Sequence, residues 1–140
     1  MMKRWCNLLV LAILIIITTA NVQDMEEEIN IPIQYYFEGT ANGDIEKLKK
    51  GFHPECKIYF VDSTEKMAFY TQSEFHDLVK KNHGKAKRIN KLIYVDRSNN
   101  TALAKTRSDF PTFYFIDYLI LLQIEGSWKI VSKSTTTYKK

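Results

Sequence analysis

The sequence predicts an α+β domain, cone-shaped, in which three helices of the N-terminal half pack on a strongly bent antiparallel sheet. Helical patterns come early in the chain and long strands come late, which is the α+β order. Several strands reach about ten residues, a length typical of strongly bent sheets. The longest apolar stretch lies in residues 110–138 and reads as a hairpin whose first strand is apolar on both faces, as in a sheet covered on both sides.

The first twenty residues have the features of a secretory signal. Lys3 and Arg4 precede an apolar run over residues 8–17, and small residues follow at positions 18–20. The alternative is an uncleaved N-terminal anchor. We therefore expect residues 21–140 to be one domain that is secreted or periplasmic, with no membrane association after cleavage.

Composition points to an ordinary globular domain. The chain carries a net charge of +4, of which Lys3 and Arg4 contribute two charges. The lysines and arginines between residues 80 and 91 straddle a helix end and a strand start, which favours a solvated surface over a nucleic-acid site. No nucleic-acid partner is expected.

Three helices are expected in the first half. Side chains suited to a buried face recur at helical spacing from residue 30 to residue 41: Ile33, Tyr36, Phe37 and Thr40. Asn42-Gly43 ends this helix, and Asp44 caps a second one that ends at Gly51. Thr71-Gln72-Ser73-Glu74 forms a capping box that starts the third helix, which ends near His83-Gly84.

Strands account for the rest of the domain. After a connector at residues 52–55, residues 57–62 and 67–70 form a hairpin. Four longer strands follow, over residues 88–96, 101–109, 112–124 and 128–138. Turn residues separate the four: Asn99-Asn100, Pro111 and Glu125-Gly126-Ser127. Such a sheet, bent around the first helix, leaves a conical space that aromatic side chains either fill or line.

Asp117 is the first candidate for function, because it is a lone carboxylate inside the apolar strand. Strand alternation places it with Phe113 on one face, but both faces are apolar, so alternation does not decide which face lines the cone. A buried carboxylate must be paired, hydrated or neutral. Either Asp117 orients a ligand or acts as acid/base with a raised pKa, or it is a structural group in a dimer seam or beside a base such as Lys105 or Arg107.

His53 is the second catalytic candidate. It lies in a connector beside an apolar run and could form a dyad with Asp117, or cap the preceding helix. The three histidines lack ligand spacing, so no metal is expected, and no phosphate loop or dinucleotide fingerprint points to a cofactor. Cys56 is the one thiol after the signal and is interpreted as buried and inert.

Several motifs, in their order and spacing, resemble the nuclear transport factor 2-like superfamily, with its SnoaL-like polyketide cyclases and ketosteroid isomerases. The similarity is greatest to the subgroup of secreted bacterial domains named putative lumazine-binding, and it covers nearly the whole mature chain. The resembling segments are residues 36–39, 42–44, 52–56, 71–75, 102–105, 115–119 and 126–133. The resemblance implies the cone-shaped, cystatin-like fold.

The resemblance also allows a test of isomerase chemistry. Ketosteroid isomerases use a tyrosine as oxyanion donor, an aspartate base and a protonated aspartate as second donor. An ungapped alignment on Gly43-Asp44 retains the tyrosine at Tyr36, puts the base at Phe60 and puts the second donor near Tyr114. A phenyl ring cannot accept a proton, so this departure argues against that chemistry.

The leading expectation is a non-catalytic domain that binds a small, flat or amphipathic molecule in the cone and forms a homodimer through its sheet. The binding residues would be two polar handles, two aromatic walls and one anchor: Tyr36 and Tyr114, Phe60 and Phe113, and Asp117. The alternative is a SnoaL-like lyase, cyclase or isomerase that uses Asp117 with His53 or Tyr36. A second alternative is a filled cone whose exposed sheet face binds a protein partner or a second copy.

Overall fold

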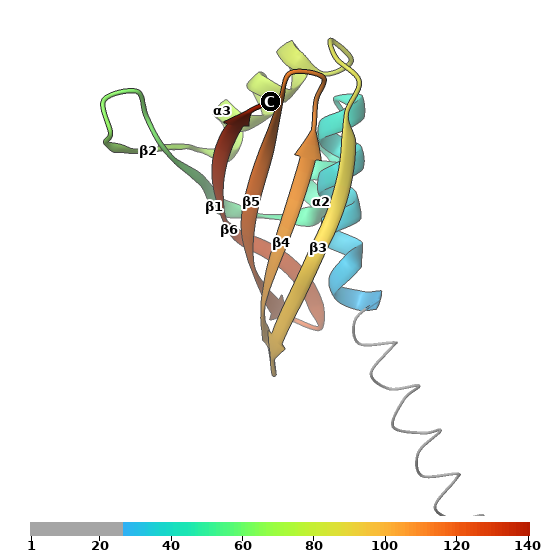
Figure 1. Ribbon diagram of the computed structural model, residues 1–140. Helices are drawn as coiled ribbons and strands as arrows, with labels where there is room; N and C mark the ends of the chain where they lie inside the picture. Colours follow the sequence, from blue (N-terminus) through green and yellow to red (C-terminus); the bar gives the residue numbers. More distant parts are fainter. Residues whose placement is uncertain (1–26) are drawn as a thin grey trace, which may run out of the picture. The chain divides into compact units, whose positions relative to one another are not determined.

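The computed structural model describes residues 27–140. The chain divides into two units, Met1–Asn30 and Ile31–Lys140, and the domain described below is the second (Figure 1). The signal peptide expected at residues 1–20 lies outside the described residues. Within the described part of the chain, no helix combines the length and the apolar character needed to cross a membrane.

Helices precede most of the sheet, as the sequence predicts. The N-terminal helix continues to residue 42. It is followed by α2 (Ile45–Gly51), β1 (Phe52–Val61), β2 (Met67–Tyr70), α3 (Gln72–Asn82), β3 (Ile89–Ser98), β4 (Thr101–Asp109), β5 (Phe113–Ile124) and β6 (Ser127–Lys139). The predicted α+β class is confirmed.

The strands of residues 31–140 form one six-stranded sheet in the order β2-β1-β6-β5-β4-β3. Neighbouring strands are antiparallel except for β1 and β6, which run parallel. The long strands β3 to β6 curve together, and the β1–β2 hairpin projects away from them (Figure 1). The sheet is therefore mixed, which corrects the expectation of a purely antiparallel one.

Several strand bounds differ from the sequence prediction by one or two residues, and the largest difference lies at the start of β1. Residues 52–55 were expected to be a connector, but β1 starts at Phe52, directly after α2. Pro54 has no N–H for the sheet ladder, and the pairing of β1 with β6 shifts register between Phe52 and Lys57. The irregularity lets a proline-containing segment stay in the sheet.

Local signals explain where the elements begin and turn. The Asp44 side chain accepts a hydrogen bond from the Lys47 amide at 3.1 Å, and Thr71 and Glu74 form the expected capping box. Between β5 and β6 the chain turns at Glu125 and Gly126, whose φ angles of 49° and 78° match a two-residue hairpin turn. The confirmed caps and turns come from short-range chemistry.

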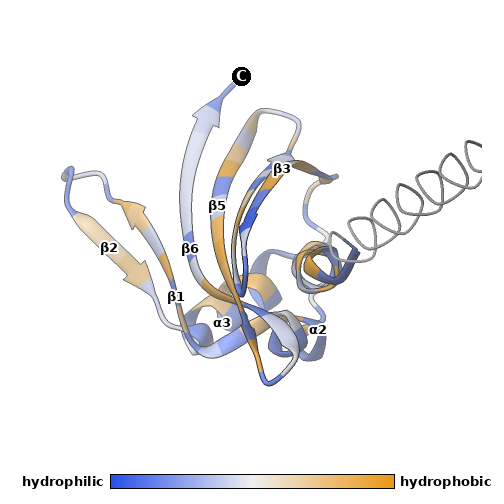
Figure 2. Cartoon of the chain, turned by 90° about the horizontal axis from the view of Figure 1, so that it is seen from below, coloured by the Kyte–Doolittle hydropathy of each residue, from blue (hydrophilic) through white to orange (hydrophobic). Residues whose placement is uncertain are grey.

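The core lies between the helices and the concave face of the sheet. Alternate residues of β5 and β6 are fully buried there, among them Leu119, Leu121 and Ile130. The opposite, convex face keeps apolar side chains such as Tyr118 and Ile120 partly exposed. Hydrophobic colour marks much of β5 and also the projecting β2 (Figure 2).

Candidate functional site

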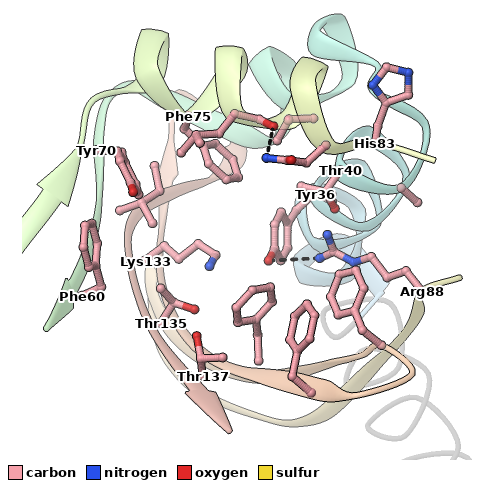
Figure 3. Close-up of a pocket in the computed structure, with 18 of the residues that line it drawn as sticks. Tyr36, Thr40, Phe60, Tyr70, Phe75, His83, Arg88, Lys133, Thr135 and Thr137 are labelled. Carbon is pink, nitrogen blue, oxygen red and sulfur yellow. Dashed lines mark hydrogen bonds between the residues drawn. The ribbon is translucent and has the colours of Figure 1, made fainter. Parts of the chain in front are cut away.

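The space between the helices and the concave face of the sheet is an open cavity of about 830 Å³. Its walls come from the N-terminal helix, β1, α3, β5, β6 and the segment that leads into β3, as Figure 3 shows. Most of the lining side chains are apolar or aromatic, including Phe60, Phe75 and Phe113. The cone is therefore not filled, which argues against the filled-cone alternative.

The register of β5 decides which of its faces lines the cavity. Phe113 and Phe115 contribute to the lining, and Asp117 continues the same face deeper into the core. Tyr114 lies on the other face, where its ring stacks on that of Tyr138 at 5.0 Å. The expectation that Tyr114 is a polar handle in the cone is thus corrected, because strand alternation turns it to the convex side.

Phe60 and Phe113 lie where the sequence predicts walls. The Phe60 ring stacks on Tyr70 of β2 with 4.8 Å between centroids, at the end of the cavity formed by the β1–β2 hairpin. Phe113 stacks on Phe110 at 4.6 Å, and both rings line the same cavity. Two stacked aromatic pairs therefore contribute to the cavity wall, a surface suited to a flat molecule.

Asp117 is completely buried and fully hydrogen-bonded. Its Oδ1 accepts from Lys133 Nζ at 2.6 Å, and its Oδ2 accepts from the Tyr36 hydroxyl at 2.7 Å. Tyr36 and Lys133 line the cavity, whereas Asp117 does not. We call the buried end of the cavity, lined by Tyr36 and Lys133, its floor. The Asp117 carboxylate lies behind this floor and holds both residues in place.

The charges of this pair stabilise each other. Burial raises the pKa of Asp117, but the charge of Lys133 and hydrogen bonds from Lys133, Thr135 and Tyr36 outweigh burial, so the pKa lies below its ordinary value. Burial lowers the pKa of Lys133, yet Asp117 and Tyr36 together keep it above its ordinary value. Both groups are therefore charged at neutral pH, and Asp117 is a poor base.

The Tyr36 hydroxyl has one proton, and it donates that proton to Asp117. Burial is the main cause that raises the pKa of Tyr36, and the negative charge of Asp117 adds to it. The hydroxyl oxygen accepts a hydrogen bond from Arg88 Nη2 at 3.3 Å. Tyr36 therefore positions its neighbours and has no second proton to give to a ligand.

Arg88 completes the floor. Its Nε donates to Asn90 Oδ1 at 2.6 Å, and its Nη2 donates to Ser108 Oγ at 2.9 Å. Its guanidinium also lies 5.7 Å from the centre of the Tyr36 ring (Figure 3). These contacts hold the guanidinium against the cavity with few ways to move.

His53 is not brought to Asp117. It lies in β1, where its Nδ1 accepts a hydrogen bond from the Glu55 amide at 3.3 Å, and it is not among the residues that line the cavity. The dyad of His53 and Asp117 considered from the sequence therefore does not form, because Asp117 is already bonded to Lys133 and Tyr36. His83, at the end of α3, lines the cavity instead.

Cys56 is buried, as the sequence predicts. Burial raises the pKa of its thiol to about 12, so almost no thiolate exists at neutral pH. Gln72 donates a hydrogen bond to the Cys56 carbonyl at 3.1 Å and ties α3 to β1. Cys56 therefore has a packing role in this geometry.

Sequence reasoning missed Lys133 and Arg88. The sequence pattern favours Lys105 or Arg107 as the base beside Asp117, and it does not distinguish Lys133. The structure places Arg107 instead in an ion pair with Asp109 at 2.7 Å. No local signal in the sequence identifies Lys133, because its inward orientation depends on a register shift between β5 and β6 at Ile120 and Leu121.

Solved structures share this fold. The domain is similar to a nuclear transport factor 2-like protein of unknown function from Shewanella baltica, with 25% identity, a TM-score of 0.77, and coverage of 85% of this chain and 97% of that one. A similar protein from Silicibacter pomeroyi is 18% identical, with a TM-score of 0.74 and coverage of 84% and 98%. A ketosteroid isomerase-like protein from Erwinia carotovora, 11% identical, shares the fold with a TM-score of 0.63 and coverage of 81% and 96%. The fold is that of the nuclear transport factor 2-like proteins.

The family follows from the sequence match. Residues 24–135 match the family described as putative lumazine-binding, and the chain belongs to that family. It is also 30% identical over 108 residues to the aldolase FrzH of a Cladobotryum species. The aligned region covers 75% of this chain and 85% of the relative.

Proposed function

We propose that the cone binds a small, flat or amphipathic organic molecule, and that the protein acts by binding rather than by catalysis. The observation that carries this proposal is an open cavity of about 830 Å³ whose aromatic walls lead to a polar floor. Small-molecule sites typically combine apolar walls with a few convergent polar groups, in volumes of this order. The stacked pairs at Phe60 and Phe113 supply the walls, and Lys133, Arg88 and Tyr36 supply the floor.

The lack of a carboxylate among the described lining residues supports a binding role. No aspartate or glutamate is among the residues that line the cavity in the described part of the chain. Asp117, the nearest buried carboxylate, is held in an ion pair and has a lowered pKa, so it is a weak proton acceptor. Proton abstraction from a carbon acid needs a base within hydrogen-bond reach of the substrate.

Blocking the cavity tests the proposal. Replacing Thr137, which lines the cavity on β6, with tryptophan is expected to weaken binding of the neutral probe N-phenyl-1-naphthylamine about tenfold or more, because the indole occupies the probe's place. Probe fluorescence measures the affinity. The control is Thr101→Trp, an exposed position at the start of β4 outside the lining. Equal affinity of both variants for the probe would exclude the cavity as the binding site.

An enzyme is the second candidate. The relative at 30% identity is named an aldolase, and Lys133 and Arg88 could polarise a ligand carbonyl from the floor. Such a lyase, cyclase or isomerase would use the Asp117 and Tyr36 pair rather than His53. Proton exchange distinguishes the two functions: with 2-acetylnaphthalene in D₂O, the binding role predicts no exchange of the methyl protons above the buffer rate, measured by NMR.

We also propose that the protein is a homodimer through the convex face of its sheet. Tyr94, Tyr118 and Ile120 are 45%, 42% and 37% exposed there, and Lys105 pairs with both tyrosines across β3, β4 and β5. Exposed apolar patches on a sheet are commonly covered by a partner. Light scattering of residues 21–140 is expected to give the mass of a dimer, and Tyr118→Lys is expected to give that of a monomer. A monomeric parent protein would contradict the proposal.

Secretion is proposed from the sequence of residues 1–20 alone. Its basic start, apolar run and small residues are those of a cleaved signal. Expression of the full chain is expected to yield a mature protein that starts near residue 21, which intact-mass spectrometry measures. Recovery of the full-length chain would favour the uncleaved anchor.

A further inference from the structure

The charges on the cavity lining are one-sided. Three cationic side chains contribute to the lining: Lys85, Arg88 and Lys133. Within residues 27–140, no carboxylate does so. Lys85 lies on an exposed segment, whereas Lys133 is 4% exposed and Arg88 is half-buried. The positive charge is therefore built into the floor and is not a chance feature of the rim.

The ion pair behind the floor neutralises only Lys133 and leaves the half-buried Arg88 without a counter-charge in the described part of the chain. Asp117 binds Lys133, and no carboxylate of the described residues lies within salt-bridge distance of Arg88. The partners of Arg88 are the neutral groups of Asn90, Ser108 and Tyr36. A half-buried guanidinium with neutral partners alone leaves a net positive charge beside an apolar cavity, which an anion would compensate.

Hydrogen-bond donors on these two cations remain available. Nε and Nη2 of Arg88 bind protein acceptors, while Nη1 makes no hydrogen bond to the described residues. The Lys133 ammonium has three donors, and its bond to Asp117 uses one of them. Tyr36 gives its proton to Asp117, so the free donors among the three floor residues are those of Arg88 and Lys133, beside neutral threonine hydroxyls of the lining.

We infer that the molecule bound in the cone carries an anionic group, such as a carboxylate, attached to a flat apolar body, and that Arg88 and Lys133 hold that group. This inference rests on the proposed binding function and names its ligand class. The apolar body lies against the aromatic walls at Phe60 and Phe113, and the anion lies on the floor next to Tyr36. Figure 3 shows Tyr36, Arg88 and Lys133 around the cavity. Charge-assisted hydrogen bonds to a carboxylate are about twice as strong as neutral ones, so charge is the main source of selectivity.

Two probes of the same shape test the inference: 2-naphthoate, which is anionic at neutral pH, and 2-naphthamide, which is neutral. Each is measured by its displacement of N-phenyl-1-naphthylamine from the folded domain. The carboxylate is expected to bind about tenfold more tightly than the amide. Arg88→Gln is expected to remove most of that difference and leave the amide unchanged, and Arg88→Lys is expected to retain part of it.

The control variant is Lys87→Gln, which removes a charge from an exposed neighbour outside the cavity lining. It is expected to leave both affinities as they are. If Arg88→Gln does not fold, the ratio of the two affinities in the unaltered protein decides the ligand class, and a smaller ratio in Arg88→Lys tests the assignment to the floor.

The outcomes separate this inference from the proposal on which it rests. Failure of N-phenyl-1-naphthylamine and both naphthalenes to bind overturns the binding function itself. Equal binding of amide and carboxylate leaves the binding function in place and overturns the anionic ligand class. A preference for the carboxylate that Arg88→Gln does not change overturns the assignment to this floor.

Discussion

Replacing Asp117 with alanine is expected to lower the free energy of unfolding by about 3–5 kcal/mol, because it leaves Lys133 as a buried ammonium without a carboxylate. Lys133 is 4% exposed and Asp117 is fully buried, so water cannot replace the lost partner without a rearrangement of the core. The Tyr36 hydroxyl would lose its acceptor as well. Urea unfolding followed by circular dichroism measures the change.

Two variants show whether the ion pair is the cause. Asp117→Leu combined with Lys133→Met removes both charges and is expected to recover most of the lost stability, since apolar replacement of a whole buried pair is often neutral. Asp96→Ala removes an exposed carboxylate on β3 and is expected to change the free energy of unfolding by about 0.5 kcal/mol or less. A double variant as unstable as Asp117→Ala would contradict the ion-pair explanation.

The same pair predicts a pH range of stability. The pKa of Asp117 is lower in the folded protein, so its contribution is present above about pH 4 and is lost as the pH falls through the folded pKa. The pKa of Lys133 is higher in the folded protein, so its contribution is present below about pH 10 and is lost as the pH rises through the folded pKa. The double apolar variant is expected to depend less steeply on pH at both ends.

Phe52→Ala is expected to cost about 3–5 kcal/mol of unfolding free energy, because it empties a fully packed position. Phe52 is 1% exposed, and its ring lies 5.6 Å from Tyr36 and 5.8 Å from Phe75 in edge contacts. It therefore supports the floor and one wall of the cavity at once. Urea unfolding measures the effect.

The matched control is Phe69→Ala, at a position on β2 that is 43% exposed. It is expected to cost about 1 kcal/mol or less, because most of its surface already faces water. Similar losses in both variants would mean that Phe52 does not hold the cavity floor as its ring contacts indicate.

The fold could be predicted because its elements carry short-range signals. Asp44 and the capping box at Thr71 fix helix starts through contacts three residues away. Glu125-Gly126 fixes a hairpin, and helical spacing places Tyr36 on the inner face of the first helix. Each signal depends only on nearby residues and on burial, so the sequence alone is enough to read it.

The residues of the cavity floor could not be predicted, because a single bulge between β5 and β6 determines that Lys133 faces the cavity. In the β5–β6 ladder, the residue pairs run regularly from the turn to Leu121 with Ile130. Val131 then has no partner, so Ile120 pairs with Ser132 and Leu119 pairs with Lys133. Without that extra residue, Lys133 would pair with Tyr118 and face the convex side. Nothing local in the sequence marks Val131 as the bulge.

The role of Arg88 could not be predicted from the sequence for a different reason. It belongs to a run of lysines and arginines that reads as solvated surface, and it lies one residue before β3. Its contact with Tyr36 joins residues 52 positions apart. Only the packing of the first helix against the edge of the sheet distinguishes it from its exposed neighbour Lys87.

The parallel pairing of β1 with β6 also bears on how the chain acquires its structure. Within the described residues, β1 is joined to the main sheet only through residues 130–134, which follow β1 by about 75 positions. A ribosome-bound chain that stops at Ile124 has an isolated β1–β2 hairpin, and two strands alone are marginally stable in water. Closing so long a loop is also slow. The two sides of the cavity therefore come together only after β6 has been synthesised, and a truncation within β6 would leave the hairpin's aromatic residues exposed to aggregation.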